Sequence, residues 1–338
     1  MTDFRHIILK LIEKKDLSEE ESIFAMSQIM DGKVSNEKIA SFLTALKSKG
    51  ESVLEIASFA KILRNKSTKI NADQKNLIDT AGTGGDLAGT FNISTCSAFA
   101  AAGAGAAVAK HGNRSSSGKF GSADVLEELG IGINITPQIA ESQLKALGIT
   151  FLFAPNFHPA MKNVSAARKE LGFRTVFNAL GPLTNPACAK RQLIGANDKI
   201  LMEKMALAVK LLGTEKTILA SSDIDEISIS CESDIMEVDN QGIKKYTLNP
   251  EDFGFKLANP GEIIARDKKE SAKIIQKVLK GENGAARDVT ILNAGAAIYA
   301  SGLCESIKNG IKKAEAAIDN KAALEKLERL RDCNGHTG

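Results

Sequence analysis

The chain is organised around one segment, Lys110-His111-Gly112-Asn113-Arg114-Ser115-Ser116-Ser117-Gly118. This segment carries two full positive charges, an imidazole, an amide and three hydroxyls, but no acid and no large apolar residue. An apolar Ala- and Gly-rich segment, residues 98–109, precedes it, and the sequence after Ser122 predicts a helix that opens on a serine cap. A donor-rich loop between a buried segment and a helix N-terminus suits a dense anion, above all a phosphate. In isolation, the same loop fits a solvated Ser/Gly surface turn equally well.

The sequence around this loop alternates short β-type runs with helical patterns. Strands are expected at 77–80, 107–109, 149–153, 192–195, 217–220, 227–230 and 235–238, and helices at 92–102, 122–130, 138–147, 159–171, 198–212, 268–280, 287–301 and 305–331. Such alternation predicts an α/β domain with a mostly parallel central sheet. Ligands bind at the carboxyl ends of the strands in that architecture, which is where the glycine-rich loops fall.

The first 66 or so residues show a different pattern, which is helical throughout. Apolar residues recur at helical spacing in four short segments, and Ser18 with Glu21 forms a capping box before the second. Four amphipathic helices with short connections predict a small bundle. A polar link at 71–74 separates it from the α/β pattern. The bundle holds no obvious chemistry and could serve as a lid or as a dimer surface.

Composition excludes several classes of function. With 338 residues, 43% hydrophobic content, 25% charged content and a net charge of +3, the chain is that of an ordinary globular protein. The small net charge, the absence of Trp and the two Tyr residues argue against a nucleic-acid platform. No apolar run approaches transmembrane length, and early lysines interrupt any signal peptide. Five scattered cysteines favour reduced thiols in a cytoplasmic enzyme and disfavour zinc.

A second glycine-rich stretch, Gly82-Thr83-Gly84-Gly85-Asp86, follows the first expected strand and continues to Thr90-Phe91-Asn92-Ile93-Ser94-Thr95. Glycines let backbone amides approach a ligand closely, and the donors at the helix start favour phosphate. The stretch lacks the Lys-Ser/Thr ending of a P-loop and the spacing of a dinucleotide fingerprint. A tight turn explains it equally well on its own, but its position one strand from Lys110 predicts a phosphate site.

Two further features complete the candidate chemistry. Asp225 and Glu226 are adjacent acids that could form a solvated turn, but a dense anion needs a divalent metal, and Mg²⁺ prefers one or two carboxylates with substrate oxygens.

Arg168 lies on an expected helix, where an arginine is most often a surface ion-pair partner. The unusual segment 174–186 that follows it favours a substrate contact instead, and arginine suits bidentate binding of a carboxylate.

Taken together, the motifs resemble the anthranilate phosphoribosyltransferase family of tryptophan biosynthesis from end to end. The resemblance rests on the joint order and spacing of Gly82–Asp86, Asn92–Thr95, Lys110–Arg114, Gly121–Asp124, Phe157–Met161, Arg174–Asn178, Gly181–Leu183 and Asp225–Glu226. It implies an N-terminal helical domain at 1–68, joined by helices near 168–185, and an α/β catalytic domain at 69–338 of the nucleoside phosphorylase and phosphoribosyltransferase type. It also implies a homodimer formed through the helical domain.

The resemblance implies a set of site residues. Phosphoribosyl pyrophosphate (PRPP) would be bound by Gly82, Gly85, Asp86, Thr90, Asn92, Ile93, Ser94, Thr95, Lys110, His111, Gly112, Asn113, Arg114, Ser115, Ser116, Ser117, Gly118 and Ser122. Mg²⁺ would be bound by Ser94, Asp225 and Glu226, and anthranilate by Gly82, Asn113 and Arg168, with Lys110, Asn113 and Arg168 as catalytic residues. Leu87 and the segment 222–224 depart from the family pattern without removing a liganding group.

The implied reaction transfers the 5-phosphoribosyl group from PRPP to the amine of anthranilate and releases pyrophosphate. An aromatic amine is a free base at neutral pH, so no strong general base is required, and catalysis would come from positioning and charge stabilisation. The alternative within this fold is a nucleoside phosphorylase-like enzyme, and a non-catalytic nucleic-acid-binding relative is the alternative from another class. The expected partners are therefore the two small substrates and a second copy of the chain, without nucleic acid or membrane.

Overall fold

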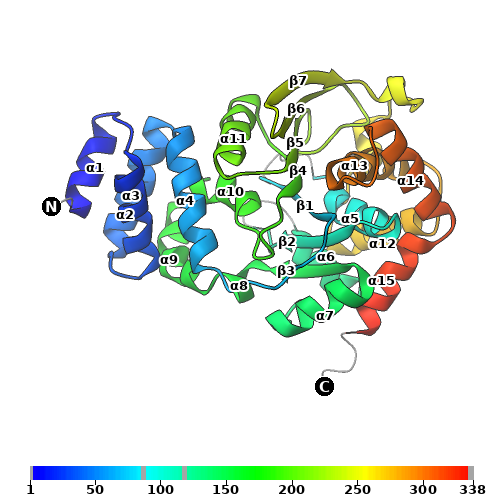
Figure 1. Ribbon diagram of the computed structural model, residues 1–338, viewed down its shortest axis with the longest axis horizontal. Coiled ribbons are helices and arrows are strands. Elements are labelled where there is room, and N and C mark those ends of the chain that lie inside the picture. The colour runs from blue at the N-terminus through cyan, green and yellow to red at the C-terminus, as the bar shows by residue number, and fades with distance from the viewer. Residues whose placement is uncertain (1–2, 85–88, 116–119, 334–338) are drawn as a thin grey trace.

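The computed structural model describes residues 3–84, 89–115 and 120–333. Figure 1 shows a helical bundle at one end of an elongated molecule and a twisted sheet flanked by helices at the other. The bundle contains α1 (Phe4–Ile12), α2 (Glu19–Met30), α3 (Asn36–Lys49) and α4 (Val53–Lys66). As the sequence predicts, Ser18 and Glu21 form a capping box at the start of α2, and Ser52 with Glu55 forms another on α4. The first 66 residues thus make the predicted four-helix unit.

Two later helices pack against this bundle. They are α9 (Lys162–Leu171), which lies on α2 and α3, and α10 (Val176–Leu180), which contacts α3 and α4. Val164 and Phe177 from these helices share one apolar core with Phe42 and Phe59 of the bundle. The segment that carries Arg168 is therefore anchored to the bundle on one side.

The sheet has seven strands in the order β3-β2-β1-β4-β5-β6-β7. The strands are β1 (Leu77–Gly82), β2 (Ala107–Gly112), β3 (Ile149–Phe153), β4 (Arg191–Gly195), β5 (Lys216–Ser221), β6 (Ser233–Asp239) and β7 (Ile243–Leu248). The first five pair in parallel, whereas β6 and β7 are antiparallel additions at one edge. This confirms the predicted mostly parallel sheet, and it places the carboxyl ends of β1, β2, β4 and β5 along one edge.

Helices cover both faces of the sheet. One face is covered by α5 (Ile93–Gly103), α6 (Ser122–Glu128), α12 (Lys268–Leu279), α13 (Ala285–Ser301), α14 (Ile307–Asp319) and α15 (Ala322–Asp332). The other carries α7 (Pro137–Leu147), α8 (Ala154–Phe157) and α11 (Lys199–Leu211), besides α10. Successive strand residues such as Ile218 and Leu219 enter opposite cores, as the period of two requires. Short 3-10 turns occur at Pro159–Met161, Gly181–Leu183, Pro250–Phe253 and Pro260–Ile263.

The structure corrects the predicted strand at 227–230, which is an irregular loop between β5 and β6. Its alternating apolar residues are buried, but a side chain replaces the sheet ladder: Ile227 N–H donates to Asn293 Oδ1 at 3.0 Å, and Asn293 Nδ2 donates to Ile227 O at 2.8 Å. The edge strand β7 pairs with β6 instead, and no strand was expected there from the sequence pattern. A period-two pattern of apolar residues is typical of a strand, but a buried loop can show the same pattern.

Three helix and loop boundaries also differ from expectation. The predicted helix 305–331 is broken at Lys321, whose φ is +68°, into α14 and α15. Gly121, not Ser122, caps α6, because the Asp124 carboxylate accepts a hydrogen bond from Gly121 N at 2.8 Å. The loop expected from Lys110 begins later, since β2 continues to Gly112. The expected frayed tail at 334–338 lies outside the described residues.

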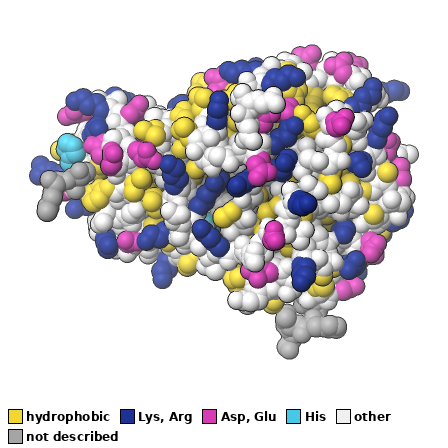
Figure 2. All heavy atoms as spheres, viewed as in Figure 1, with side chains coloured by type: hydrophobic (Ala, Val, Ile, Leu, Met, Phe, Trp, Pro, Cys, Tyr) yellow, Lys and Arg dark blue, Asp and Glu magenta, His cyan; other side chains and the backbone are white. Residues whose placement is uncertain are grey.

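Among the helices that the structure describes, none is both long enough and apolar enough to span a bilayer. Figure 2 shows that Lys and Arg side chains gather over the middle of one face, where the bundle meets the α/β part, while both charge signs are interspersed elsewhere.

Candidate active site

The carboxyl ends of three neighbouring strands are glycines. Gly82 ends β1, Gly112 ends β2 and Gly195 ends β4. A Cβ on Gly195 would lie 1.5 Å from the Asp225 carbonyl oxygen, and one on Gly82 would lie 2.9 Å from Asp225 Oδ2. A side chain at either position would therefore displace the loop that carries the paired acids. Sequence reasoning missed Gly195, whose signal was a glycine as the last residue of an expected strand.

Lys110 lies inside β2 and is buried, with 4% of its surface exposed. Its ammonium donates to Thr80 O at 2.5 Å and to Ser94 Oγ at 3.1 Å. Burial lowers the pKa of Lys110, while the negative charges of Asp79 and Glu226 act in the opposite direction. The residue expected on an exposed phosphate loop is thus a buried cation that links β1, the start of α5 and the acidic loop.

Asp79 is the second buried charge under this edge and is fully inaccessible. Burial raises the pKa of Asp79 to about 6, against the opposing effects of the Asn185 amide and the Lys110 charge. Its Oδ1 accepts a hydrogen bond from His111 N at 3.1 Å. Asn185 in turn donates to Ala109 O at 2.7 Å. These bonds fix the end of β2 from below.

The predicted donors at the start of α5 differ in burial and in the hydrogen bonds that they already make. The Asn92 side chain already accepts from Ser271 Oγ at 3.0 Å, and Thr90 forms an isolated bridge with Ile264. Thr95 is buried, and its hydroxyl has no hydrogen-bond partner within the described part of the chain. Ser94 is only partly buried, and its oxygen accepts the Lys110 ammonium. Of the hydroxyls at this helix start, Ser94 is the best placed for a metal ligand.

Asp225 and Glu226 lie in the loop after β5, which one serine closes. Ser222 Oγ accepts from Ile224 N at 3.2 Å and donates to the carbonyls of Ile224 and Glu226, each at 3.0 Å. Glu226 is 7% exposed. The two carboxylates and the Ser94 hydroxyl form an all-oxygen donor set that fits Mg²⁺ and leaves positions for water and substrate oxygens. No group of three or more His, Cys, Asp or Glu side chains forms a metal cage within residues 3–84, 89–115 and 120–333.

The loop after β2 is exposed from Asn113 to Ser115. Arg114 is ion-paired with Asp124 at 2.9 Å and with Glu127 at 2.6 Å, and these acids raise the pKa of Arg114. The backbone of this loop lies directly against Gly121, since a Cβ there would be 2.5 Å from Asn113 O. A Cβ on Gly112 would similarly meet Ser122 Oγ at 2.3 Å. The predicted site residues Gly85, Asp86, Ser116, Ser117 and Gly118, together with Leu87, lie outside the described residues.

His111 and His158 form a buried imidazole pair beside this loop, with ring centroids 5.0 Å apart. Burial lowers the pKa of His111 to about 3 and the pKa of His158 to about 4. His111 Nδ1 lies 3.2 Å from Gly181 O, and neither Nε2 has a partner among the described residues. Both rings are therefore neutral at physiological pH, and His111 supplies no positive charge to a phosphate site.

Arg168 occupies the last turn of α9, and its guanidinium carbon lies 5.1 Å from the centroid of the Phe177 ring. Burial lowers the pKa of Arg168. Within the described residues no carboxylate lies at ion-pair distance from Arg168, in contrast to the paired Arg114 and Arg266. A partly buried guanidinium on an aromatic platform can accept a substrate carboxylate.

The predicted residues thus fall into two groups. Gly82, Ser94, Lys110, Asp225 and Glu226 come together at the ends of β1, β2 and β5, as the contacts above show. Arg168 lies on the bundle side, and α10 connects it to this group through Gly181 and His111. Asn113, Arg114, Ser115 and Ser122 lie on the loop between β2 and α6.

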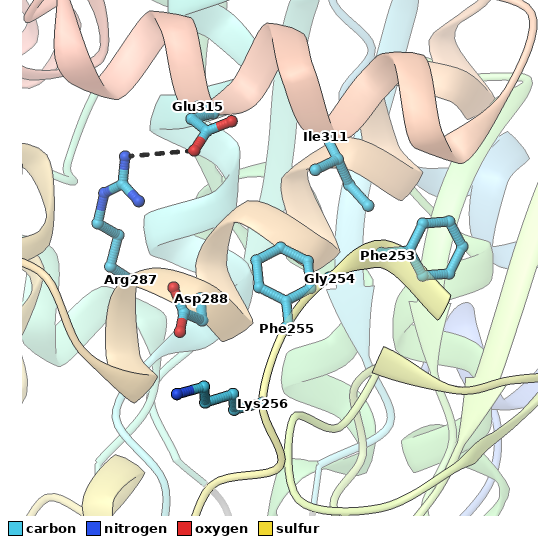
Figure 3. Close-up of a pocket in the computed structure, with 8 residues that line it drawn as sticks. All are labelled: Phe253, Gly254, Phe255, Lys256, Arg287, Asp288, Ile311 and Glu315. Carbon is cyan, nitrogen blue, oxygen red and sulfur yellow. Dashed lines mark ion pairs between the residues drawn. The ribbon is translucent and has the colours of Figure 1, made fainter. Parts of the chain in front are cut away.

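A cavity of about 330 Å³ lies elsewhere, between the segment 253–256 and the helices α13 and α14 (Figure 3). None of its lining residues belongs to the predicted site. Its most buried cation, Arg287, is already 2.7 Å from Asp319 and 4.0 Å from Glu315. The volume of this cavity therefore gives no reason to place the chemistry there.

Comparison with known proteins finds relatives over nearly the whole chain. The α/β domain model of a glycosyl transferase family matches residues 74–324, and its helical bundle domain model matches residues 5–67. The anthranilate phosphoribosyltransferase of Methanosphaerula palustris is 46% identical over 329 residues, 96% of this chain and 97% of that protein. That of Alkaliphilus metalliredigens is 46% identical over 323 residues, 95% of each.

Solved structures give the same result. The anthranilate phosphoribosyltransferase of Thermus thermophilus superposes with a TM-score of 0.91 at 39% identity, covering 97% of this chain and 98% of that one. The Saccharomyces cerevisiae enzyme in complex with PRPP and Mg superposes with a TM-score of 0.89 at 28% identity, covering 98% and 97%. The resemblance in the motifs, the fold and the near-complete similarity to these relatives lead to one conclusion: the chain belongs to the anthranilate phosphoribosyltransferase family.

Proposed function

We propose that this protein transfers the 5-phosphoribosyl group from PRPP to the amine of anthranilate, giving N-(5-phosphoribosyl)anthranilate and pyrophosphate in tryptophan biosynthesis. The observation that carries the proposal is the convergence of Lys110, Ser94 and Glu226 at one edge of the sheet, with Gly82 against Asp225. The yeast relative solved with PRPP and Mg, and again with 4-fluoroanthranilate, supports the choice of substrates.

In this reaction the anthranilate nitrogen attacks C1 of PRPP, the bond from C1 to pyrophosphate breaks, and the amine proton leaves to solvent. Mg²⁺, which Ser94, Asp225 and Glu226 would hold, neutralises charge on the diphosphate when it is bound. The buried Lys110 orients the Ser94 oxygen and adds a fixed positive charge beneath the site. Asn113 and Gly82 would contact both substrates, and Arg168 would hold the anthranilate carboxylate.

Ile93, Thr95 and Ser122 lie at the starts of α5 and α6, where the helix dipole favours an anion. The N–H groups of Ile93 and Thr95 already donate to Phe91 O at 2.7 Å and to Asn92 O at 3.1 Å, so their support for PRPP is the helix dipole. Arg114 reaches a phosphate only by exchanging its bonds to Asp124 and Glu127. Gly85, Asp86, Ser116, Ser117 and Gly118 keep their proposed role from the resemblance alone.

A fluorescence assay tests the proposed function. Wild-type protein mixed with anthranilate, PRPP and Mg²⁺ should consume anthranilate emission, and omitting PRPP or adding EDTA should stop the decay. Unchanged emission would contradict the proposal. Release of a base from a nucleoside in the presence of inorganic phosphate would then favour the phosphorylase alternative.

We also propose a division into a helical unit, 1–68 with the helices near 168–185, and an α/β unit, 69–338, with homodimerisation through the helical unit. Exposed Leu9 and Ile12 on α1 support a contact surface there, since they are 47% and 60% exposed. Sedimentation should give a dimer at micromolar concentration, and Leu9→Glu with Ile12→Glu should give a monomer. A wild-type monomer would contradict this assembly.

A further inference from the structure

Arg174 lies in the short connection between α9 and α10, the two helices that carry Arg168 and Phe177. α9 ends at Gly172, whose φ of +63° turns the chain sharply, and α10 begins after Thr175. Arg174 therefore starts from the bundle side of the molecule, next to the proposed anthranilate contact. Its side chain, however, points to the other substrate's loop.

The guanidinium of Arg174 is shared among three acceptors on the far side of the site. Nη2 donates to Thr83 O at 3.1 Å and to Asn197 Oδ1 at 3.4 Å, and Nη1 donates to Gly84 O. The planar fork of arginine suits several acceptors at once, whereas a lysine ammonium cannot span them in the same way.

The residues that Arg174 contacts are themselves fixed. Thr83 N–H donates to Gly195 O at 2.9 Å, and Asn197 N–H donates to Thr83 Oγ1 at 3.2 Å. Thr83 is thus held to the end of β4 through its backbone and side chain, and Arg174 holds its carbonyl. Gly84, with a φ of +64°, is where the chain leaves this fixed point.

The direction of these carbonyls determines what the loop offers to a ligand. A trans peptide points its N–H opposite to its C=O. Because Thr83 O points at Arg174, the Gly84 N–H points away from Arg174. A positive charge that holds carbonyls on one side of a glycine-rich turn therefore leaves amide hydrogens for an anion on the other side.

We propose that Arg174 is a positioning residue for the phosphoribosyl donor: from the segment that carries the acceptor's carboxylate contact, it orients the Thr83–Gly84 peptide after β1 so that the Gly84 N–H faces the diphosphate. The inference rests on the proposed function and deepens it. It predicts that Arg174, although it is close in sequence to the proposed anthranilate contact Arg168, affects the binding of PRPP and not that of anthranilate.

Steady-state kinetics with both substrates varied tests the proposal on Arg174→Gln, Arg174→Lys and Arg168→Ala. Arg174→Gln should raise the KM for PRPP about ten- to a hundredfold, as expected for loss of charge-assisted hydrogen bonds, and change the KM for anthranilate by less than about threefold. Arg174→Lys should recover only part of the loss. Arg168→Ala should show the reverse pattern.

Arg191→Gln is the matched control, since Arg191 also donates to a backbone carbonyl, Ala300 O at 3.1 Å, but at the amino end of β4. It should lower Tm without moving either KM. Asn197→Ala, which removes one acceptor and keeps Arg174, should raise the KM for PRPP by a smaller factor and provides the test if Arg174→Gln does not fold.

Three results would overturn the inference. If Arg174→Gln lowers Tm as Arg191→Gln does and leaves the KM for PRPP unchanged, Arg174 is only structural. An increase confined to the KM for anthranilate would assign it to the acceptor. Wild-type protein that consumes no anthranilate would overturn the proposed function and this inference together, whereas active wild type with an unaffected Arg174→Gln overturns the inference alone.

Discussion

The bundle and the carboxyl edge of the sheet both bury titratable groups, but they satisfy them differently. In the bundle, the inaccessible Glu55 accepts from Leu17 N at 3.0 Å, Ser52 N at 2.7 Å and Lys49 Nζ at 2.9 Å. At the sheet edge, the Nε2 atoms of His111 and His158 have no partner in the part of the chain that the structure describes, whereas the buried bundle atoms without a partner are the neutral hydroxyls of Ser22 and Ser58. Buried polar groups that are fully paired rigidify a fold, while incompletely paired ones are costly unless a ligand completes them.

The glycines show the same contrast. At the sheet edge, Gly82 and Gly195 are pressed against Asp225, so space there is reserved for the acidic loop. In the bundle, Gly50 ends α3 with a φ of +87° and serves only to stop a helix. The glycines at the sheet edge shape the candidate site, whereas Gly50 in the bundle ends a helix. We therefore expect substitutions in the bundle to change stability and substitutions at the sheet edge to change activity, and four experiments test this expectation.

The largest effect should come from the acidic loop. Asp225→Asn combined with Glu226→Gln should reduce turnover at least about a thousandfold, because removing a metal's charge stabilisation costs several kcal/mol of activation free energy. Tm should change little, since Ser222 closes this loop through the backbone carbonyls of Ile224 and Glu226. Turnover is measured by anthranilate fluorescence and Tm by circular dichroism. Asp223→Asn, an exposed acid on the same loop, is the control, and activity retained in the double variant would remove metal anchoring from the account.

In the bundle the effect should fall on stability alone. Lys49→Met leaves the buried Glu55 without its cation and should lower the free energy of unfolding by about 3–5 kcal/mol. Lys61→Met breaks the exposed pair with Glu19, at 2.7 Å, and should cost at most about 1 kcal/mol. Urea denaturation measures both, and kcat per folded molecule should stay constant. A fall in kcat for Lys49→Met would mean that the bundle network acts on the site.

Arg168 lies where the two regions meet. Arg168→Ala should raise the KM for anthranilate about ten- to a hundredfold, since a charge-assisted pair contributes roughly 1.5–3 kcal/mol. Arg168→Lys should restore only part of this, and Lys169→Ala, an exposed cation on the same helix, should change neither constant. A two-substrate kinetic matrix measures these constants. A shift confined to PRPP would refute the assignment of Arg168 to anthranilate.

The smallest effect concerns pH. The folded-state pKa values of His111 and His158, about 3 and about 4, lie below the ordinary value of 6.5. Below pH 6.5 the unfolded chain therefore binds more protons, and the free energy of unfolding falls as the pH drops toward 4. His158→Asn should remove about 1–2 kcal/mol of the change between pH 6.5 and 5. Urea denaturation at several pH values checks this, and an unaltered slope would show that His158 is not buried in its neutral form.

Much of the fold could be predicted because local patterns report burial directly. The capping box at Ser18 and the apolar periodicity of the first 66 residues predict the bundle, and Leu77, Val108 and Ile149 mark parallel strands. The same patterns misassigned 227–230, because Asn293, distant in sequence, satisfies the backbone there. The expected last helix is interrupted where Asn320 caps α14 and Lys321 adopts a left-handed conformation, a break that the apolar periodicity did not indicate.

Residue types and their spacing are local properties, and they were enough to predict the family, the fold class and the kinds of side chain at the site. How those side chains act depends on the folded arrangement. It buried Lys110 under Ser94, made His111 neutral, placed Arg168 on Phe177 and directed Arg174 to the loop after β1. The physical reason is that charge state and orientation depend on desolvation and on partners from distant segments, which only the folded chain brings together.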